Sequence, residues 1–287
     1  MDSSTKIKTS KTPLWLWPNL LGLDAPIVAI SWQWLFAHSF KIDLPFTIHL
    51  VLGLSAWCVY LADRLIDVRK NNFNDFETDR HRFTRRNFKP LLIALLIAAV
   101  VNLALIITTI PKILVFSGIV TAALVGIYYL IRFFASTTAL TILPREILCG
   151  MLFALGSAIG PHAYAPVELD EFAYLIPVAF FGTLCSVSCI LISIWERSAD
   201  MANSDNSFGS IHPFLAKSFS SGLTSLTLIA TAMAFFSTTE LFVAIAISSL
   251  SLRITVQLDR RLSQSMLRVL ADALLLSPLL ILIWSLF

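Results

Sequence analysis

Long apolar runs dominate this sequence and restrict its fold more than any other feature. Nine of them follow one another along the chain, and charged residues or prolines separate most of them. A helix needs about 20 apolar residues to cross the hydrocarbon core of a bilayer, where only helices and closed barrels satisfy their backbone groups. The runs do not alternate in polarity as half-buried strands do. The sequence therefore predicts an all-α protein, a polytopic transmembrane helical bundle.

The nine predicted helices cover residues 14–38, 44–67, 90–109, 113–132, 144–160, 172–196, 220–237, 240–257 and 267–287. The divisions at Pro111 and at Glu240 are the weakest. Each pair of helices that they separate is nevertheless too long for a single crossing, so we expect about nine transmembrane helices.

The composition excludes a soluble globular domain. Of 287 residues, 57% are hydrophobic and 14% are charged, whereas a soluble domain carries about 25% charged residues. Residues 1–12 form a polar tail, and residues 13–287 form a single transmembrane domain. The apolar run behind the tail is longer than a signal-peptide core and no cleavage pattern follows it, so we expect a retained helix. We expect membrane lipids as partners and no nucleic acid.

The basic residues predict an orientation. With nine helices and a cytoplasmic N-terminus, every Lys and Arg except Lys41 and Lys112 falls in an inner segment or its flanks. The segment between the fifth and sixth helices carries three acids and no Lys or Arg. This is the positive-inside pattern. We therefore expect an integral protein of a bacterial plasma membrane, with its C-terminus outside.

The cysteines indicate neither a metal site nor a disulfide framework. None of the four stands at a spacing typical of such sites, and all lie inside apolar runs. They are Cys58, Cys149, Cys185 and Cys189. We interpret them as packing residues.

An acid pair ends the second predicted helix. Asp63 and Asp67 are four residues apart, so both carboxylates lie on one helix face about a turn apart. Like charges at this spacing repel each other unless a cation binds between them, and Mg²⁺ prefers one or two carboxylates together with phosphate oxygens. The alternative is a helix end whose charges pair with Arg64 and Arg69.

A second acid pair ends the sixth predicted helix on the same membrane side. Glu196 and Asp200 are again four residues apart, and Asp205 follows. The two pairs could face each other across a cavity and hold two cations with a diphosphate between them. The alternative is a solvated Ser/Asn-rich loop with ordinary capping acids.

Arginines near these acids are candidate anion ligands. Seven Lys or Arg occur between residues 69 and 89, where they attract anionic headgroups. The planar fork of Arg also binds two phosphate oxygens at once, and Arg80 and Arg82 are the best candidates for that role. Arg145 begins the fifth helix against the helix dipole rule, so it could point at a bound anion.

Three polar residues stand alone within apolar runs. For Asn102 we favour an interhelical hydrogen bond. For Asp24 and Asp272 a cavity-lining role and simple pairing with a neighbouring helix remain equal alternatives. The loop histidines His81, His162 and His212 have no ligand partners at a recognisable spacing, so we do not expect them to be catalytic.

Nine helices, a cytoplasmic N-terminus and these two acid pairs together resemble the UbiA family of intramembrane prenyltransferases. The family's first motif is NDxxDxxxD, and the segment from Asp63 to Asp67 matches its second half. Val59 and Tyr60 stand in place of the leading Asn-Asp. The segment from Glu196 to Asp200 is similar to the DxxxD-like second motif, with Glu in its first place.

The resemblance implies a transferase that moves an isoprenyl group from a polyprenyl diphosphate to a hydrophobic acceptor, with Mg²⁺ as cofactor. Metal binding would fall to Asp63, Asp67, Glu196 and Asp200. Diphosphate binding would fall to Arg64, Arg80, Arg82, Arg145 and Asp205. The missing Asn-Asp removes potential ligands, so Asp75, Glu77 and Asp79 either compensate or the activity is altered.

Two other readings of the sequence remain open. A transporter or lipid-handling protein could use the same cavity without transfer, although transporters usually place polar residues on interrupted helices near the midplane. The incomplete first motif also leaves a catalytically silent member of the fold as an alternative.

Overall fold

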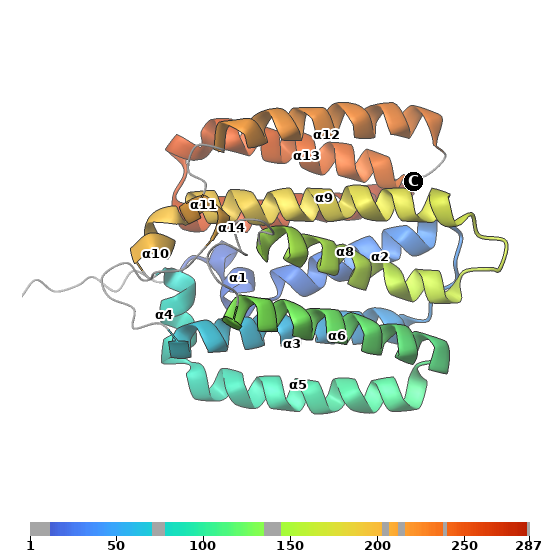
Figure 1. Ribbon diagram of the computed structural model, residues 1–287, viewed down its shortest axis with the longest axis horizontal. Helices are drawn as coiled ribbons and strands as arrows, with labels where there is room; N and C mark the ends of the chain where they lie inside the picture. Colours follow the sequence, from blue (N-terminus) through green and yellow to red (C-terminus); the bar gives the residue numbers. More distant parts are fainter. Residues whose placement is uncertain are drawn as a thin grey trace, which may run out of the picture.

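The computed structural model describes residues 12–70, 78–134, 145–202, 207–211, 216–237 and 240–285, and within them every regular element is a helix (Figure 1). The longer helices are α2 (Asp24–Ser39), α3 (Phe46–Lys70), α5 (Phe88–Thr109), α6 (Lys112–Phe134), α8 (Arg145–Tyr164), α9 (Glu171–Trp195), α12 (Ala216–Phe236), α13 (Leu241–Leu258) and α14 (Gln264–Ala273). The shorter ones are η1 (Leu14–Leu16), α1 (Trp17–Leu21), α4 (Asp79–Arg86), α10 (Arg197–Ala202), α11 (Phe208–Ile211), η3 (Asp259–Arg261), η4 (Leu274–Leu276) and α15 (Ser277–Ser285).

The prediction of an all-helical protein is confirmed for the described residues. Seven described helices are long and apolar enough to cross a membrane, and the bent pair Leu14–Leu21 and Asp24–Ser39 is an eighth candidate. The apolar stretch Lys112–Tyr128 of α6 is shorter. Each of the nine predicted segments thus coincides with helix in the described part of the chain, while the number of crossings stays a prediction.

The prediction of one continuous helix over 14–38 is wrong. The chain bends by 81° between Leu21 and Asp24. Gly22 adopts the left-handed conformation with φ of 71°, and the amides of Gly22 and Leu23 donate to the carbonyls of Asn19 and Pro18. This double hydrogen bond is the Schellman motif that ends helices. Because α1 stops there, Asp24 lies in the first turn of a new helix and not in mid-run.

The core lies where α2, α8 and α9 meet α13 and the C-terminal helices. Trp32 stacks on Phe181 with ring centroids 3.9 Å apart, and its indole Nε1 donates to the Leu275 carbonyl oxygen at 2.7 Å. Both rings are fully buried. Burying a Trp requires a partner for its N–H, and the carbonyl freed at the η4 turn supplies one. These contacts fix α2 and α9 against the last helices.

The outer helices present apolar side chains to their surroundings. On α5, Val100 and Ile107 are 68% and 73% exposed, and on α6 Phe116 is 67% exposed. A surface of this kind suits lipid. Between these helices and the core, Asn102 donates to the Ser55 hydroxyl at 2.8 Å, which confirms the predicted interhelical hydrogen bond.

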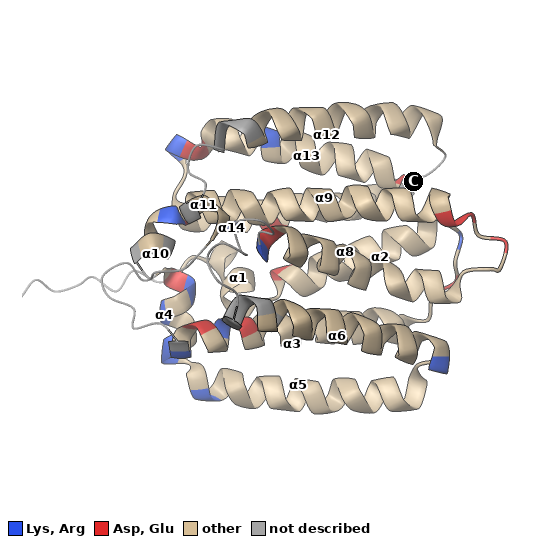
Figure 2. Ribbon diagram, in the orientation of Figure 1, with Lys and Arg blue, Asp and Glu red and all other residues tan. Residues whose placement is uncertain are grey.

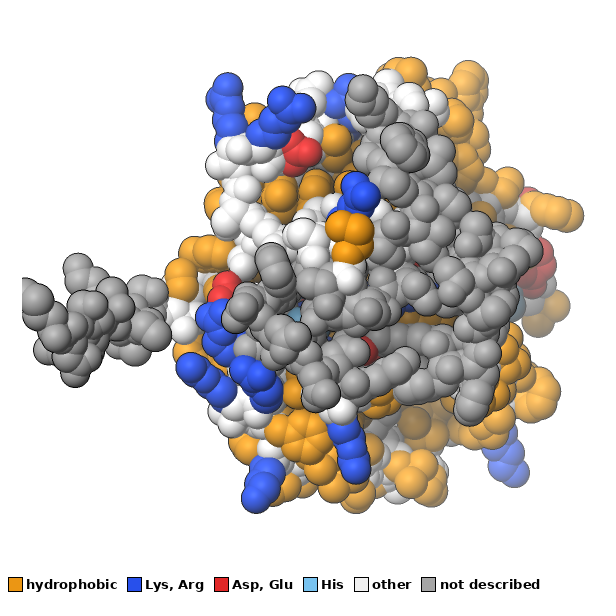
Figure 3. Space-filling view, turned by 60° about the vertical axis from the view of Figure 1, so that its left-hand side comes forward, with side chains coloured by type: hydrophobic (Ala, Val, Ile, Leu, Met, Phe, Trp, Pro, Cys, Tyr) orange, Lys and Arg blue, Asp and Glu red, His pale blue; other side chains and the backbone are white. Residues whose placement is uncertain are grey.

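The two ends of the bundle differ in charge. Most Lys and Arg side chains lie at the end formed by α4, α10 and η3, called the basic end below, while acids gather near the start of α9 at the other end (Figure 2). Viewed from the basic end, Lys and Arg side chains lie around the margin and hydrophobic side chains cover the flanks (Figure 3). The predicted loop over 68–89 contains α4, which the Thr78 side chain caps by accepting from the His81 amide.

Candidate functional site

A cavity of about 370 Å³ extends from the basic end into the bundle, with walls from α2, α3, α4, α6, α8, α9 and α14. The charged residues that line it are Asp63, Asp67, Arg80, Arg145, Glu146, Glu196, Arg268 and Asp272. Further along, the lining becomes apolar and includes Leu52, Ala56, Val125, Leu152 and Phe153. The cavity is therefore amphipathic, with a charged head region and an apolar tail region.

One face of α3 follows the whole cavity. Leu52, Ala56, Tyr60, Asp63 and Asp67 all line it, and their spacing of three or four residues keeps them on the same side of a helix. Fifteen residues of helix rise span about 22 Å. The sequence of α3 thus places the acid pair at the basic end and small or apolar side chains deeper in the bundle.

The structure brings together most of the predicted site residues. Asp63, Asp67, Arg80, Arg145 and Glu196 come from four separate elements and line the same cavity. Local helix geometry accounts for the acid pair, because residues four apart on α3 share a face. Glu196 caps the end of α9, which brings it to the same end of the bundle.

Glu196 is held by two guanidinium groups. Its Oε2 accepts from Arg268 Nη1 at 2.6 Å, and Arg80 Nη2 lies 3.9 Å away. Burial alone raises the pKa of this carboxyl group, but Arg268 and Arg80 lower the pKa to about 2. Arg268 also reaches the Tyr60 hydroxyl at 3.5 Å. An ionised Glu196 therefore links α9, α4, α14 and α3 at the head of the cavity.

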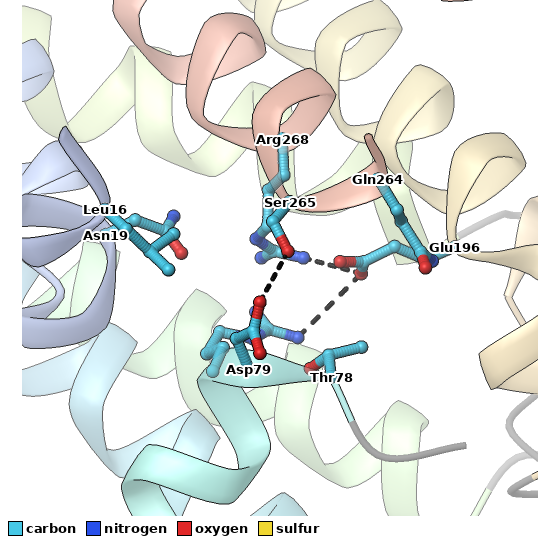
Figure 4. A pocket seen from close by; sticks show the side chains of 9 residues that line it. Leu16, Asn19, Thr78, Asp79, Glu196, Gln264, Ser265 and Arg268 are labelled. Atoms are coloured by element: carbon cyan, nitrogen blue, oxygen red, sulfur yellow. Dashed lines mark hydrogen bonds and ion pairs between the residues drawn. The ribbon is translucent and has the colours of Figure 1, made fainter. Parts of the chain in front are cut away.

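A second, smaller pocket lies beside this ion pair. It has a volume of about 190 Å³ and a polar lining that includes Asn19, Thr78, Asp79, Gln264 and Ser265. In Figure 4, Arg268 approaches Glu196 from one side, and the Ser265 hydroxyl donates to the Asp79 carboxylate at 2.9 Å. Because Arg80, Glu196 and Arg268 line both pockets, the ion pair forms the partition between them.

The electrostatics of α4 favour an anion. Burial, and then repulsion by Arg268, lowers the pKa of Arg80, while burial, and then the neighbouring Arg80, lowers the pKa of His81 to about 3. His81 is therefore neutral near pH 7. Arg268 and Arg64 lower the pKa of Arg80 while Glu196 raises it, so an anion bound beside Arg80 would relieve the repulsion among these arginines.

Two of the predicted anion ligands lie away from the cavity. Arg64 is only 2% exposed and donates to the Leu20 carbonyl oxygen at 3.0 Å, with its guanidinium over the Tyr60 ring at 4.3 Å. It fixes the end of α1 to α3. Arg82 is half exposed and pairs with Asp79 at 3.6 Å. Neither residue lines the large cavity.

The remaining acids of the sequence motifs do not line the large cavity or lie outside the described side chains. The backbone of Asp200 lies in α10, but its side chain is not described. Asp75, Glu77 and Asp205 lie outside the described residues. Asp79 lines the smaller pocket and does not line the large one.

The carboxylates that line the cavity differ in how well they suit Mg²⁺. Asp63 and Asp67 offer two carboxylates on one helix face, which fits an ion that takes one or two protein carboxylates and completes its shell with water and phosphate. Glu196 does not fit a second ion, because Arg268 already holds its carboxylate at 2.6 Å. Among the described residues, no cluster of three or more His, Cys, Asp or Glu is placed to bind a metal.

Sequence reasoning missed Arg268. It precedes Asp272 by four residues inside an apolar run, and an opposite-charge pair at that spacing in a membrane helix is a functional signal. Glu146, in the first turn of α8, is buried and accepts from the Phe208 amide at 2.9 Å. That bond fixes α11 against the start of α8.

Comparisons with protein-family models, with curated proteins and with solved structures return no match. The resemblance to intramembrane prenyltransferases therefore stays a prediction from the sequence.

Proposed function

We propose that this protein is an intramembrane prenyltransferase, which moves an isoprenyl group from a polyprenyl diphosphate to a hydrophobic acceptor. The observation that carries the proposal is the amphipathic cavity, whose charged head region and apolar tail region follow one face of α3. A polyprenyl diphosphate has the same division, with a charged head and a long apolar chain. The basic end faces the cytoplasm in this proposal.

The head region supplies the charges that such a substrate needs. Arg80, Arg145 and Arg268 line it together with Asp63 and Asp67. In the transfer, the bond between C1 of the isoprenyl group and the diphosphate oxygen breaks, and the electron pair leaves with the diphosphate. The arginines stabilise the charge that grows on the departing group. Asp63 and Asp67 would hold Mg²⁺, which supplies Lewis-acid neutralisation of the diphosphate.

The tail region protects the allylic cation that remains. Ala56, Val125, Leu152 and Phe153 present only apolar surface there, so no side chain among them competes with the acceptor for the cation. Exclusion of water also strengthens the attraction between the arginines and the diphosphate. The acceptor must be apolar enough to enter the same space from the membrane.

Binding of a fluorescent polyprenyl diphosphate to the full-length protein in detergent micelles tests the proposal. We expect Mg²⁺-dependent binding that Asp63→Asn and Asp67→Asn weaken by at least about tenfold, a loss that even outer-shell partners of a metal can cause. The matched control is Asp43→Asn, an exposed acid between α2 and α3. Binding without Mg²⁺ dependence, or equal binding by all variants, would contradict the proposal.

A second candidate is a lipid-handling protein or silent member that binds an amphipathic phosphate without transfer. The observation that favours it is the Glu196–Arg268 ion pair, which occupies an acid that the family pattern would give to a second metal ion. Release of inorganic diphosphate from geranylgeranyl diphosphate separates the two candidates. Binding with no release over many hours would favour the second.

A further inference from the structure

On α8, the tail region of the large cavity ends at a glycine. Of the α8 residues that line the cavity, Arg145 is the first and Gly156 is the last. Cys149, Leu152 and Phe153 are among those between them, and spacings of three or four residues keep the set on one helix face. Arg145 and Gly156 are eleven residues apart, which corresponds to about 16 Å of helix rise. The wall formed by α8 thus runs from the head region to Gly156.

A second wall, formed by α3, has the same length. Asp63 is the deeper member of the acid pair in the head region, and Leu52 is the deepest α3 residue that lines the cavity. These two residues are also eleven apart, and α3 and α8 run in opposite directions through the bundle (Figure 1). Leu52 therefore lies near the depth of Gly156, and both walls give the tail region a depth of about 16 Å.

The cavity closes within one further helical turn. Gly160 follows Gly156 by one turn of α8, and Ile48 precedes Leu52 by one turn of α3. A Cβ at Gly160 would lie 2.9 Å from Ile48 Cγ2 and 2.7 Å from Gln33 Nε2. Both distances are shorter than the roughly 3.5–4.0 Å at which nonbonded atoms pack. Because Ile48 and Gln33 are also buried, α8, α3 and α2 meet at this level and form the floor of the tail region.

Gly156 itself borders open space. A Cβ at this position would meet no atom within 4 Å, although the next turn of the same helix is closely packed. Protein interiors are packed almost as densely as organic crystals, so open space beside a helix that lines the cavity belongs to the cavity. A longer side chain at position 156 would therefore enter the tail region just before its floor.

We propose that Gly156 sets the length of the isoprenyl chain that the cavity accepts. The diphosphate lies in the head region, so the far end of a long chain reaches the space beside Gly156 and Leu52. A shorter chain ends before this space and makes no contact there. The proposal rests on the proposed function, because it needs an isoprenyl chain in the tail region.

Binding of tritiated prenyl diphosphates of different lengths to the full-length protein, with Mg²⁺, tests the proposal. Gly156→Leu fills the end of the tail region, so we expect it to bind geranylgeranyl diphosphate at least about tenfold more weakly than wild type, the scale on which an apolar pocket discriminates by size. It should bind the shorter geranyl diphosphate within about twofold of wild type, because no contact with that chain changes. Retained binding of geranyl diphosphate also shows that the variant is folded.

Gly118→Leu is the matched control. Gly118 lies on α6, and a Cβ there also meets no atom within 4 Å, but the residue does not line the cavity. We expect this variant to bind both diphosphates as wild type does. Equal weakening of both ligands by Gly156→Leu, or no weakening of either, would overturn the role of Gly156 and leave the proposed function standing. Failure of the wild-type protein to bind any prenyl diphosphate would overturn the proposed function and this role with it.

Discussion

At the scale of single residues, the Glu196–Arg268 ion pair decides how the head of the cavity is held. The two side chains are only 10% and 12% exposed and their closest atoms are 2.6 Å apart. Removing one partner of a buried pair leaves the other charged and unpaired. Loss of either side chain would therefore destabilise the contact between the end of α9 and α14.

We expect Arg268→Ala to lower the free energy of unfolding by about 3–5 kcal/mol, the cost of an uncompensated buried charge. The measurement is denaturant unfolding in detergent micelles followed by tryptophan fluorescence. The control is Arg82→Ala, which removes a half-exposed pair and should cost no more than about 1 kcal/mol. Equal losses in the two variants would show that the Arg268 pair is not buried as the structure has it.

His81 makes the folded protein sensitive to acid. Its folded-state pKa of about 3 lies below the ordinary value of 6.5, mainly because it is buried and then because Arg80 is adjacent. The unfolded chain therefore binds the proton first, and stability falls as the pH drops from 6.5 towards 3. Glu196 adds a loss in the same direction, but only below its ordinary pKa of 4.5.

The window between pH 6.5 and pH 4.5 thus separates the titration of His81 from that of Glu196. We expect His81→Gln to flatten the decline of unfolding free energy in that window and to leave the steeper decline below it. Comparison of the two proteins at pH 8, where His81 of the wild type is uncharged in both the folded and the unfolded chain, measures whatever the substitution costs apart from titration. Parallel pH profiles would mean that His81 is already accessible to protons in the folded state.

At the scale of elements, the contact between α8 and α9 depends on a missing side chain. A Cβ at Gly150 would lie on the backbone of Ser186, closer than atoms can approach. Small residues allow helix backbones to come together in membranes, where packing and not the hydrophobic effect drives association. Gly156 lies on the same helix, and a Cβ there would meet nothing within 4 Å.

These two glycines give a matched pair of variants. We expect Gly150→Ala to lower the free energy of unfolding by about 1–3 kcal/mol through overpacking. Gly156→Ala should raise it by about 0.5–1 kcal/mol, because Ala loses less backbone entropy than Gly in a helix. Thermal unfolding of both variants in one detergent provides the comparison. A stabilised Gly150→Ala would place α8 farther from α9 than the structure does.

At the scale of the whole molecule, the sequence predicts features set by residues close together in the chain. It misses contacts between residues that are far apart in the chain. The apolar runs locate the helices, and the spacing of Asp63 and Asp67 puts them on one face, since both are local properties. The Glu196–Arg268 pair joins residues 72 positions apart, so no local pattern reveals it.

Some missed features did have local signals. Gly22 followed by Asp24 and Pro26 combines a typical helix stop with a typical helix start, yet the apolar run around them concealed the 81° bend. The hydrogen bond from the Ser265 hydroxyl to Asp79 had no such signal, because it depends on how α4 and α14 pack. Long-range packing, and not local propensity, therefore completes the head of the cavity.

The orientation of the whole chain is still a prediction, and fusion proteins test it. If nine helices cross the membrane from a cytoplasmic N-terminus, a C-terminal alkaline phosphatase fusion should be active outside and a C-terminal green fluorescent protein fusion should stay dark. Truncation after Arg261, which ends η3 at the basic end, removes the last crossing and should reverse both readouts. Because the positive-inside rule predicts the basic end to be cytoplasmic, fluorescence from the full-length fusion would mean an even number of crossings. Either α6, whose apolar stretch Lys112–Tyr128 is short, or the bent pair α1–α2 would then not span the bilayer, and the cavity would need a different entrance for its substrate.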